Sequence, residues 1–443
     1  MNRNNEGAAR YSRRRFLRTL GLAAGGLLAA PLVAPRGASA APAQAASGAG
    51  AKSSPATAFR VKVGVLLPQS TLYPRLGSNF LAGMKTCLGM LGHDRAPQEI
   101  SLVPEDIELG ARLAPQKGAA MLRNGRLNLL VGVLTPSVAA SFQGLLAANK
   151  GLLLASNLGE NMPRRDHHSP DVFYHTLGYW QANYTLGSWA ARNLGPRVLC
   201  ATSFYDSGYD ALHAFRLGVE NAGGEVVNTH ISHMSGGSED LAPLMAAIDA
   251  AKPDAVYGGY CGQHAVDFVK AYANSRLAGR VPLVGSAFLT DESILSAQGN
   301  AALDIHTCFS WSSTLANQEN NAFMAAYRQN TGHAPDAFAL LGFEAARLVV
   351  EAVKAAGGDT GNTARLRSAL SAAKFDGPRG LVGMGAQGES TGGTLHLRKV
   401  KWEGRTPQNS FASQLDATPE GDAQVDALRA SEKTGWLNAY LSM

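Results

Sequence analysis

Short apolar runs alternate with helical patterns along most of the chain. Residues Phe59–Leu67 predict a strand with a buried end, and the apolar spacing of Leu76–Leu91 predicts a helix. Further strands are predicted at 127–134, 151–155, 197–201, 224–228, 255–258 and 281–285, with amphipathic helical patterns between them. Short apolar strands separated by helices are typical of parallel sheets covered on both faces. The pattern therefore predicts an α/β protein with enough chain for two such sheets.

Residues 1–40 contain the three parts of a bacterial secretory signal. Arg13 and Arg14 lie in a basic segment, an uncharged apolar run covers 19–34, and Ala38-Ser39-Ala40 is a small-residue cleavage site. The apolar run is interrupted by glycine and proline and is shorter than the ~20 residues of a membrane span. We therefore expect cleavage after Ala40 rather than a permanent anchor.

The basic segment 12–18 also resembles the twin-arginine pattern, which implies export of the folded protein to the periplasm. Residues 41–58 consist almost entirely of Ala, Ser, Gly and Pro, so we expect a flexible leader there.

The positive charge of the chain belongs to this signal. Residues 1–40 hold seven arginines and one acid, Glu6, so that 33 of the 40 basic and 33 of the 34 acidic residues remain after cleavage. A neutral mature protein gives no support for nucleic acid or an anionic membrane surface as a partner.

Metal, cofactor and catalytic motifs are not evident. The four cysteines have no metal-like spacing, and no disulfide is assigned. His167-His168 follows Asp166, but the neighbouring prolines and arginines favour a solvated polar loop over a metal site. Neither a P-loop nor an H-E-x-x-H or G-x-S-x-G motif occurs. We expect no catalytic residues, no metal and no cofactor.

Thr135-Pro136-Ser137 directly follows an apolar strand. Ligands of open parallel sheets bind outside the carboxyl ends of the strands. Thr135 suits a helix N-cap and Pro136 the first helical position, and the two hydroxyls could hold a ligand carboxylate. A purely capping role for Thr135 and Ser137 is the alternative.

An ordered series of segments resembles the type 1 periplasmic solute-binding proteins, the branched-chain amino acid receptors of ABC importers (leucine-binding-protein family). The series covers nearly the whole mature chain. It consists of Val63–Gly77, Phe80–Lys85, Leu130–Val133, Phe173–Thr176, Ala222–Val227, Pro253–Tyr260 (PDAVYGGY), Pro282–Gly285, Phe323–Arg328 and Phe375–Gly380.

The resemblance implies two Rossmann-like lobes joined by a hinge of three crossovers, with ligand held between the lobes and enclosed by hinge closure. Matching positions place the crossovers near His175, Phe309 and Phe375. Lobe 1 would comprise 59–174 and 310–374, and lobe 2 would comprise 175–309 and 375–443. The helical apolar spacing of 423–443 predicts a last helix that packs on a lobe.

The resemblance also implies which residues contact the ligand. They lie in loops that follow strands of either lobe. From lobe 1 they are Ser70, Tyr73, Leu76, Thr135, Ser137, Asn157, Leu158, Gly159 and Glu160, and from lobe 2 they are Tyr205, Asp206, Ser207, Tyr260, Ser286 and Phe288.

One departure from the family bears on the ligand. The amino acid receptors carry an acid in the loop after the strand that ends here at Gly285, where it pairs with the ligand ammonium, and Ser286-Ala287-Phe288 has none. Glu160 or Asp206 could replace that charge, because a buried ammonium needs a partner. Otherwise an aromatic or aliphatic acid without an amine fits better, with Arg75 as a possible counter-ion and with Tyr73, Tyr205, Tyr260 and Phe288 as walls.

The resemblance therefore implies a non-enzymatic, monomeric, periplasmic binding protein for a small carboxylate-bearing solute, with an inner-membrane ABC permease as partner. A sensory receptor component is the first alternative, and a periplasmic enzyme exported in the folded state is the second. The sequence leaves transport and sensing open.

Overall fold

The computed structural model describes residues 58–69, 74–108, 112–124, 127–204, 206–232, 241–385 and 387–416, together with Ala423 and Ala427. The predicted signal peptide, the leader up to residue 57 and nearly all of the predicted last helix lie outside these residues. Among the described helices, none has the length and apolar character needed to span a membrane.

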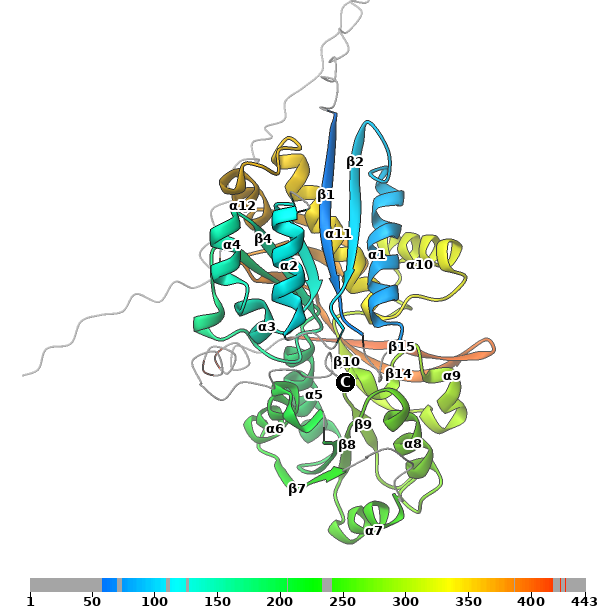
Figure 1. Cartoon of the computed structure of the whole chain (residues 1–443). Helices are drawn as coiled ribbons and strands as arrows, with labels where there is room; N and C mark the ends of the chain where they lie inside the picture. Colours follow the sequence, from blue (N-terminus) through cyan, green and yellow to red (C-terminus); the bar gives the residue numbers. More distant parts are fainter. Residues whose placement is uncertain are drawn as a thin grey trace, which may run out of the picture. The chain divides into compact units, whose positions relative to one another are not determined.

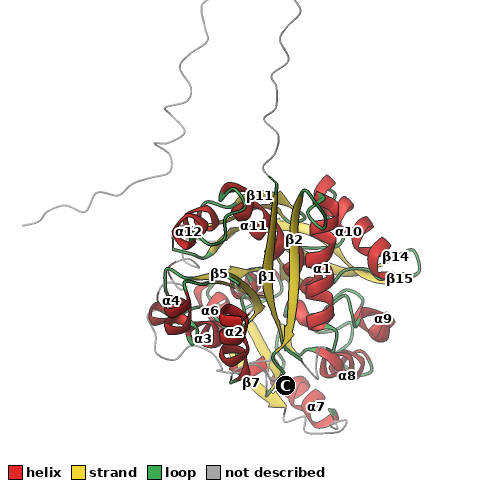
Figure 2. Ribbon diagram, turned by 45° about the horizontal axis from the view of Figure 1, so that its top comes forward, coloured by secondary structure: helices red, strands yellow, loops and turns green. Residues whose placement is uncertain are grey.

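The first sheet is wholly parallel, with strand order β2-β1-β3-β4-β5. Its strands are β1 (Phe59–Leu67), β2 (Gln98–Asp106), β3 (Leu129–Val133), β4 (Leu152–Asn157) and β5 (Val172–Thr176), and its connecting segments are α1 (Leu76–Leu91), α2 (Leu113–Asn124), α3 (Pro136–Ala140), α4 (Gln143–Asn149) and η2 (Arg165–His167). Helices cover both faces of the sheet (Figure 2), with α1 packed on one apolar cluster and α2 on another. Every residue of β3 and β4 is buried, as predicted for strands covered on both sides.

The second sheet has the order β15-β14-β10-β9-β8-β6-β7. Its parallel strands are β6 (Arg197–Ser203), β7 (Glu225–Ser232), β8 (Ala255–Gly259), β9 (Leu283–Gly285) and β10 (His306–Phe309), and β14 (Leu395–Glu403) and β15 (Thr406–Leu415) are antiparallel. Its helical segments are α5 (Tyr179–Asn193), η3 (Asp206–Gly208), α6 (Asp210–Asn221), α7 (Ala242–Ala251), α8 (Gly262–Ala273), η4 (Ala287–Thr290), α9 (Leu295–Gln298) and η5 (Gly299–Ala302). The predicted two-lobe α/β fold is confirmed (Figure 1).

After β10 the chain returns to the first lobe. It forms α10 (Gln318–Thr331), α11 (Ala337–Ala355), α12 (Thr363–Ser371) and a small antiparallel sheet of β11 (Lys374–Gly377), β12 (Gly380–Met384) and β13 (Ser390–Gly392). Helix α11 packs along α1, and Glu389 forms an isolated parallel β-bridge with Tyr174 of β5, so the chain up to Glu389 still contacts the first lobe. We therefore propose that the third crossover lies near Gly393 rather than near Phe375. The boundaries near His175 and Phe309 are kept as proposals.

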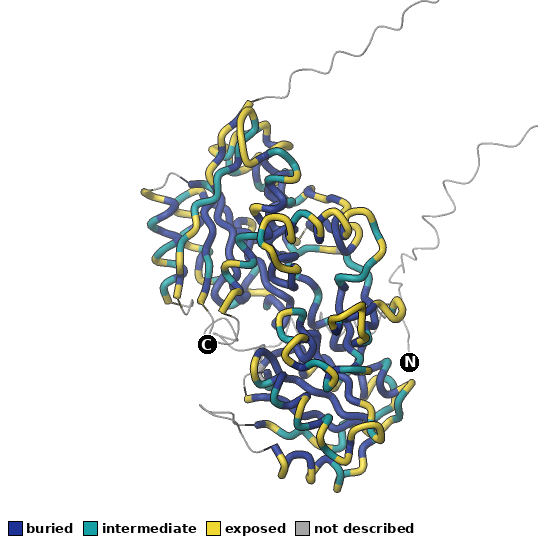
Figure 3. The backbone as a smooth tube through the Cα atoms, turned by 90° about the vertical axis from the view of Figure 1, so that its right-hand side faces the viewer, coloured by how far each residue is buried: buried dark blue, intermediate teal, exposed yellow. Residues whose placement is uncertain are grey.

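Buried backbone follows the strands of both lobes, and the exposed positions lie on outer helical faces and loops (Figure 3). The four cysteines are free and buried. Burial raises the pKa of Cys87, Cys200 and Cys308 to about 12, so these thiols stay protonated at neutral pH.

Candidate ligand-binding site

The loop after β4 connects the two lobes. We call residues 158–162 the strap loop. The backbone oxygens of Leu158 and Gly159 accept hydrogen bonds from the first amides of α5, at 2.9 Å each, and Glu160 O accepts from Ala211 N of α6 at 3.1 Å. The free amides at helix starts need such acceptors. The strap loop therefore leaves the first lobe and is bonded to the second.

Side chains extend these contacts between the strap loop and α6. Asn161 Oδ1 accepts from Asp210 N at 3.1 Å, and Met162 N donates to Asp210 Oδ2 at 3.0 Å. Gly159 has a φ of +90°, and an added Cβ would lie 3.1 Å from Tyr179 N. Only glycine combines this left-handed backbone with so close an approach.

The first-lobe half of the site consists of hydroxyl and amide groups. Thr135 is the N-cap of α3, although its Oγ1 accepts from Val138 N over a long 3.4 Å. Ser137 is half-buried on the first turn. Asn157 Nδ2 donates to Leu134 O at 3.1 Å, and its Oδ1 accepts from Gly159 N at 3.0 Å. Because α3 has only five residues, its dipole contributes little, and the hydroxyls are the groups available to an anion.

The second-lobe half is a buried polar cluster around Asp206. Ser203 Oγ donates to Asp206 Oδ2 at 2.5 Å, whereas Oδ1 accepts no hydrogen bond from nitrogen or oxygen. The charge of Asp206 would act on the hydroxyls of Tyr179 and Tyr257, and the Cys261 thiol is a hydrogen-bond partner of its carboxyl group. Burial raises the pKa of Asp206 to about 7, against the lowering effect of Ser203 and Cys261.

Further hydroxyl groups surround this cluster. Ser286 Oγ lies beside the phenols of Tyr179 and Tyr257, and its presence partly offsets the strong raising of their pKa values by burial. Tyr257 donates to Asn183 Oδ1 at 2.8 Å. The cluster thus contains one carboxyl and four hydroxyls, those of Ser203, Ser286, Tyr179 and Tyr257.

Both lobes contribute aromatic rings to one wall of the site. The centroids of Tyr179 and Phe288 are 4.9 Å apart, and those of Phe288 and Phe338 are 6.4 Å apart and stacked. Phe338 belongs to α11 of the first lobe, whereas Phe288 belongs to η4 of the second. All three rings are buried, so an apolar body enclosed here would meet aromatic surface from both lobes.

The structure separates the predicted contact residues into groups. Leu158, Gly159, Glu160, Asp206, Ser286 and Phe288 lie in the strap loop, the polar cluster or the aromatic wall, and Thr135, Ser137 and Asn157 line the carboxyl ends of β3 and β4. Leu76 belongs to the hydrophobic core, and Ser207 Oγ donates to Phe204 O at 2.6 Å. Ser70, Tyr73 and Tyr205 lie outside the described residues.

Tyr260 lies in the core of the second lobe. Its ring stacks on Phe268 with a centroid distance of 4.3 Å, and its hydroxyl pairs with Ser232 at 2.9 Å. These contacts favour a structural role over the predicted contact of Tyr260 with the ligand. Arg75, predicted as a possible counter-ion, is close enough to Asp291 of the second lobe to lower the pKa of that acid, although burial raises it more.

Sequence reasoning missed Tyr179, Asn183, Tyr257 and Phe338. Tyr179 immediately follows Gly178 at the first crossover, and Tyr257 sits two residues before Gly259 at the end of β8. Both residues can be identified as candidate site residues once the strands have been assigned from the sequence. Asn183 and Phe338 lie within helices, where no sequence signal separates them from packing residues.

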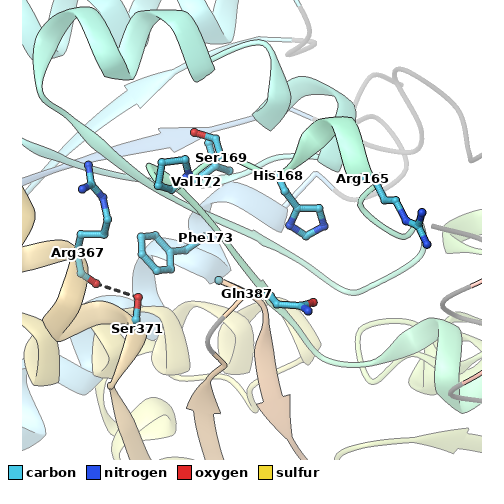
Figure 4. A pocket seen from close by; sticks show the side chains of 10 residues that line it. Arg165, His168, Ser169, Val172, Phe173, Arg367, Ser371 and Gln387 are labelled. Atoms are coloured by element: carbon cyan, nitrogen blue, oxygen red, sulfur yellow. Dashed lines mark hydrogen bonds between the residues drawn. The ribbon is translucent and has the colours of Figure 1, made fainter. Parts of the chain in front are cut away.

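A separate pocket of about 720 Å³ lies in the first lobe at the amino-terminal end of β5 (Figure 4). Its charged groups are already paired: Arg367 contacts Asp171, and His168 Nε2 is 3.2 Å from Glu389 Oε1. Arg165 points away from the pocket in Figure 4. The pocket therefore offers less to a ligand than the groups between the lobes. Within the described ranges, no group of three or more His, Cys, Asp or Glu residues has a metal-binding arrangement.

Comparisons with known proteins agree with this architecture. A solute-binding protein of an ABC transporter from R. palustris, solved with benzoate, is 28% identical, has a TM-score of 0.70, and the match covers 81% of this chain and 98% of that one. A solute-binding protein from Rhodopseudomonas palustris BisB5, solved with 3,4-dihydroxybenzoic acid, is 24% identical with a TM-score of 0.71 over 82% of this chain and 99% of that one. The fold is thus that of two-lobed solute-binding proteins.

Residues 60–406 match the sequence profile of a family described as Periplasmic binding protein. The chain belongs to this family, as its resemblance to the type 1 periplasmic solute-binding proteins predicted. The Leu/Ile/Val-binding protein homolog 6 of Brucella melitensis is 26% identical over 347 residues, which are 77% of this chain and 87% of that protein.

Proposed function

We propose that the protein is the periplasmic substrate-binding component of an ABC importer and captures a small carboxylate-bearing solute between its lobes by hinge closure. The observation that carries this proposal is the set of buried hydroxyl, carboxyl and aromatic groups contributed by both lobes, with the ring of Phe288 stacked against that of Phe338. Family membership and the ABC-transporter relatives support the general role. The delivery partner would be an inner-membrane permease.

An aromatic acid without an amine is the ligand class that we propose. Ser286-Ala287-Phe288, directly after β9, contains no acid, so it lacks the family's partner for an ammonium. The aromatic wall suits a flat ring, and the R. palustris relative was solved with benzoate. Thr135, Ser137 and Asn157 are the groups that we propose for the carboxylate.

Replacement of Ser137 by alanine should weaken carboxylate binding by about one to two decades, because a charge-assisted hydrogen bond contributes ~1.5–3 kcal/mol. Titration calorimetry with benzoate measures the change. Arg367→Met in the separate pocket is the control and should retain wild-type affinity. If Ser137 only supports the α3 turn, the variant should instead lose ~0.5–2 kcal/mol of stability and keep its affinity.

We also propose export by the twin-arginine route, on the basis of Arg13 and Arg14. Replacement of both arginines by lysine should retain the precursor in the cytoplasm, which cell fractionation measures. An undiminished amount of periplasmic protein would show that another export route is used.

A further inference from the structure

Asp206 occupies a position that the capture of a carboxylate does not explain. It lies in η3 at the carboxyl end of β6 and is only 5% exposed. An acid repels a carboxylate ligand, and burying it costs free energy unless it has a compensating partner. One oxygen is bonded to Ser203, and the other accepts no hydrogen bond from nitrogen or oxygen. The Cys261 thiol is a second hydrogen-bond partner of this carboxyl, and because a carboxylate oxygen can accept two hydrogen bonds, Oδ1 can still accept one from a ligand.

The neighbours of this oxygen favour a hydroxyl over an ammonium. An ammonium has three donors and needs several acceptors, whereas a hydroxyl needs one acceptor and can itself accept one hydrogen bond. Asp206 Oδ1 supplies one acceptor, and the hydroxyl of Ser286, which is buried beside the phenols of Tyr179 and Tyr257, can supply the donor. Tyr257 already donates its proton to Asn183. The cluster is thus suited to one neutral group that both donates and accepts.

We infer that Asp206 and Ser286 bind a hydroxyl group carried by the ligand at the end remote from its carboxylate, so that the protein selects hydroxylated aromatic acids over unsubstituted ones. The inference rests on the proposed function, because it assumes that an aromatic carboxylate binds between the lobes. It deepens that function by making Asp206 the residue that determines specificity.

The protonation of Asp206 adds a second readout. The titratable groups around it are Cys261 after β8, Tyr257 on β8 and Tyr179 on α5, and burial raises the pKa of both tyrosines well above its usual value, so both phenols stay neutral at pH 7. Burial raises the pKa of Asp206 to about 7, so the carboxylate form, which is the stronger acceptor, becomes dominant above that pH. The preference for a hydroxylated ligand should therefore increase from pH 6 to pH 8.

Titration calorimetry with benzoate and 4-hydroxybenzoate tests the inference. The wild-type protein should bind 4-hydroxybenzoate about 10- to 150-fold more tightly than benzoate. Asp206→Ala should abolish this ratio, and Asp206→Asn should reduce the ratio and remove its dependence on pH. Asp249→Asn, the same change at a half-exposed acid of α7, is the matched control and should behave like the wild type.

The outcomes separate the two proposals. Equal wild-type affinity for the two acids, or an unchanged ratio in folded Asp206→Ala, would overturn the inference and leave the proposed function standing. Binding of neither acid by the wild type would overturn both the inference and the proposed aromatic-acid ligand class. Melting curves of each variant show whether it is folded, and the Asp206→Asn arm remains decisive if Asp206→Ala does not fold.

Discussion

Replacement of Arg379 by methionine should lower the free energy of unfolding by about 3–5 kcal/mol, because the change leaves a buried charge without its partner. Arg379 Nε donates to both carboxylate oxygens of Glu344, at 2.9 and 3.0 Å, and both side chains are almost completely buried. His175 Nε2 lies 3.1 Å from the same carboxylate. Burial opposes ionisation of Glu344, but the nearby Arg379 and His175 outweigh it and hold its pKa below the usual value.

The location of Arg379 makes this effect relevant to the hinge. Its Nη2 donates to Thr176 O at 3.0 Å, and a Cβ on Gly393 would lie 2.3 Å from its Nη1. Ser310, at the second crossover, donates to Leu177 O at the first. The segments of the three proposed crossovers therefore lie close to one guanidinium group, and we expect the variant to lose hinge geometry as well as stability.

Urea unfolding at several pH values measures the effect. In the wild type, the stabilisation from Glu344 is present above the unfolded pKa of the acid and is lost as pH falls through its lowered folded pKa. In the variant, Glu344 has lost its partner, so protonation of this acid stabilises the folded protein. The difference in the free energy of unfolding between the wild type and the variant should therefore shrink from pH 7 to pH 4. A double variant, Arg379→Met with Glu344→Gln, should recover part of the loss. A deficit below about 1 kcal/mol at pH 7 would contradict the assigned role.

Replacement of Gly342 by valine should destabilise the first lobe by about 3 kcal/mol or more, because the added atoms meet backbone that cannot move aside. A Cβ at Gly342 of α11 would lie 2.0 Å from Phe80 O of α1, and one at Gly83 of α1 would lie 2.0 Å from Ala339 O. The two helices thus cross with their backbones in contact. Gly187 and Gly218 give α5 and α6 of the second lobe the same close approach, at 2.1 and 2.0 Å.

Thermal and urea unfolding of Gly342→Val measure the loss, with Gly144→Ala as the control. Gly144 lies in α4, and nothing is within 4 Å of its added Cβ, so alanine there should stabilise by ~0.4–1 kcal/mol. Equal stability of Gly342→Val and the wild type would show that the α1–α11 contact can open without cost.

The sequence predicts the first lobe well because its elements are regular. The predicted strand 59–67 and helix 76–91 coincide with β1 and α1, since buried parallel strands and a two-faced helix have clear periodicity. The edge strand β2 was missed because most of its residues are half-buried or exposed and it has no continuous apolar run. The hairpin of β14 and β15 was missed although its short turn at Gly404-Arg405, with a left-handed glycine, is a local signal, whereas the pairing of β14 with β10 depends on the fold.

The site was predictable only where residues follow strands. Asp206, Ser286 and the strap loop come directly after β6, β9 and β4, and the topology places such loops at the carboxyl ends of the sheets. Tyr260 obeys the same rule, yet its side chain turns into the core, since a position in a loop does not fix the direction of a side chain. Phe338 approaches the site from a helix distant in sequence, and only the fold brings it there.

Small-angle X-ray scattering of the mature protein tests the central claim most directly. The protein would be freed of copurified solute by unfolding and refolding, and then titrated with a panel of benzoates and branched-chain amino acids whose binding is followed by calorimetry. A saturating ligand should bind once per chain and reduce the radius of gyration, because only the closed form contacts it from both lobes. Scattering curves that are identical with and without a tightly bound ligand would contradict capture by hinge closure.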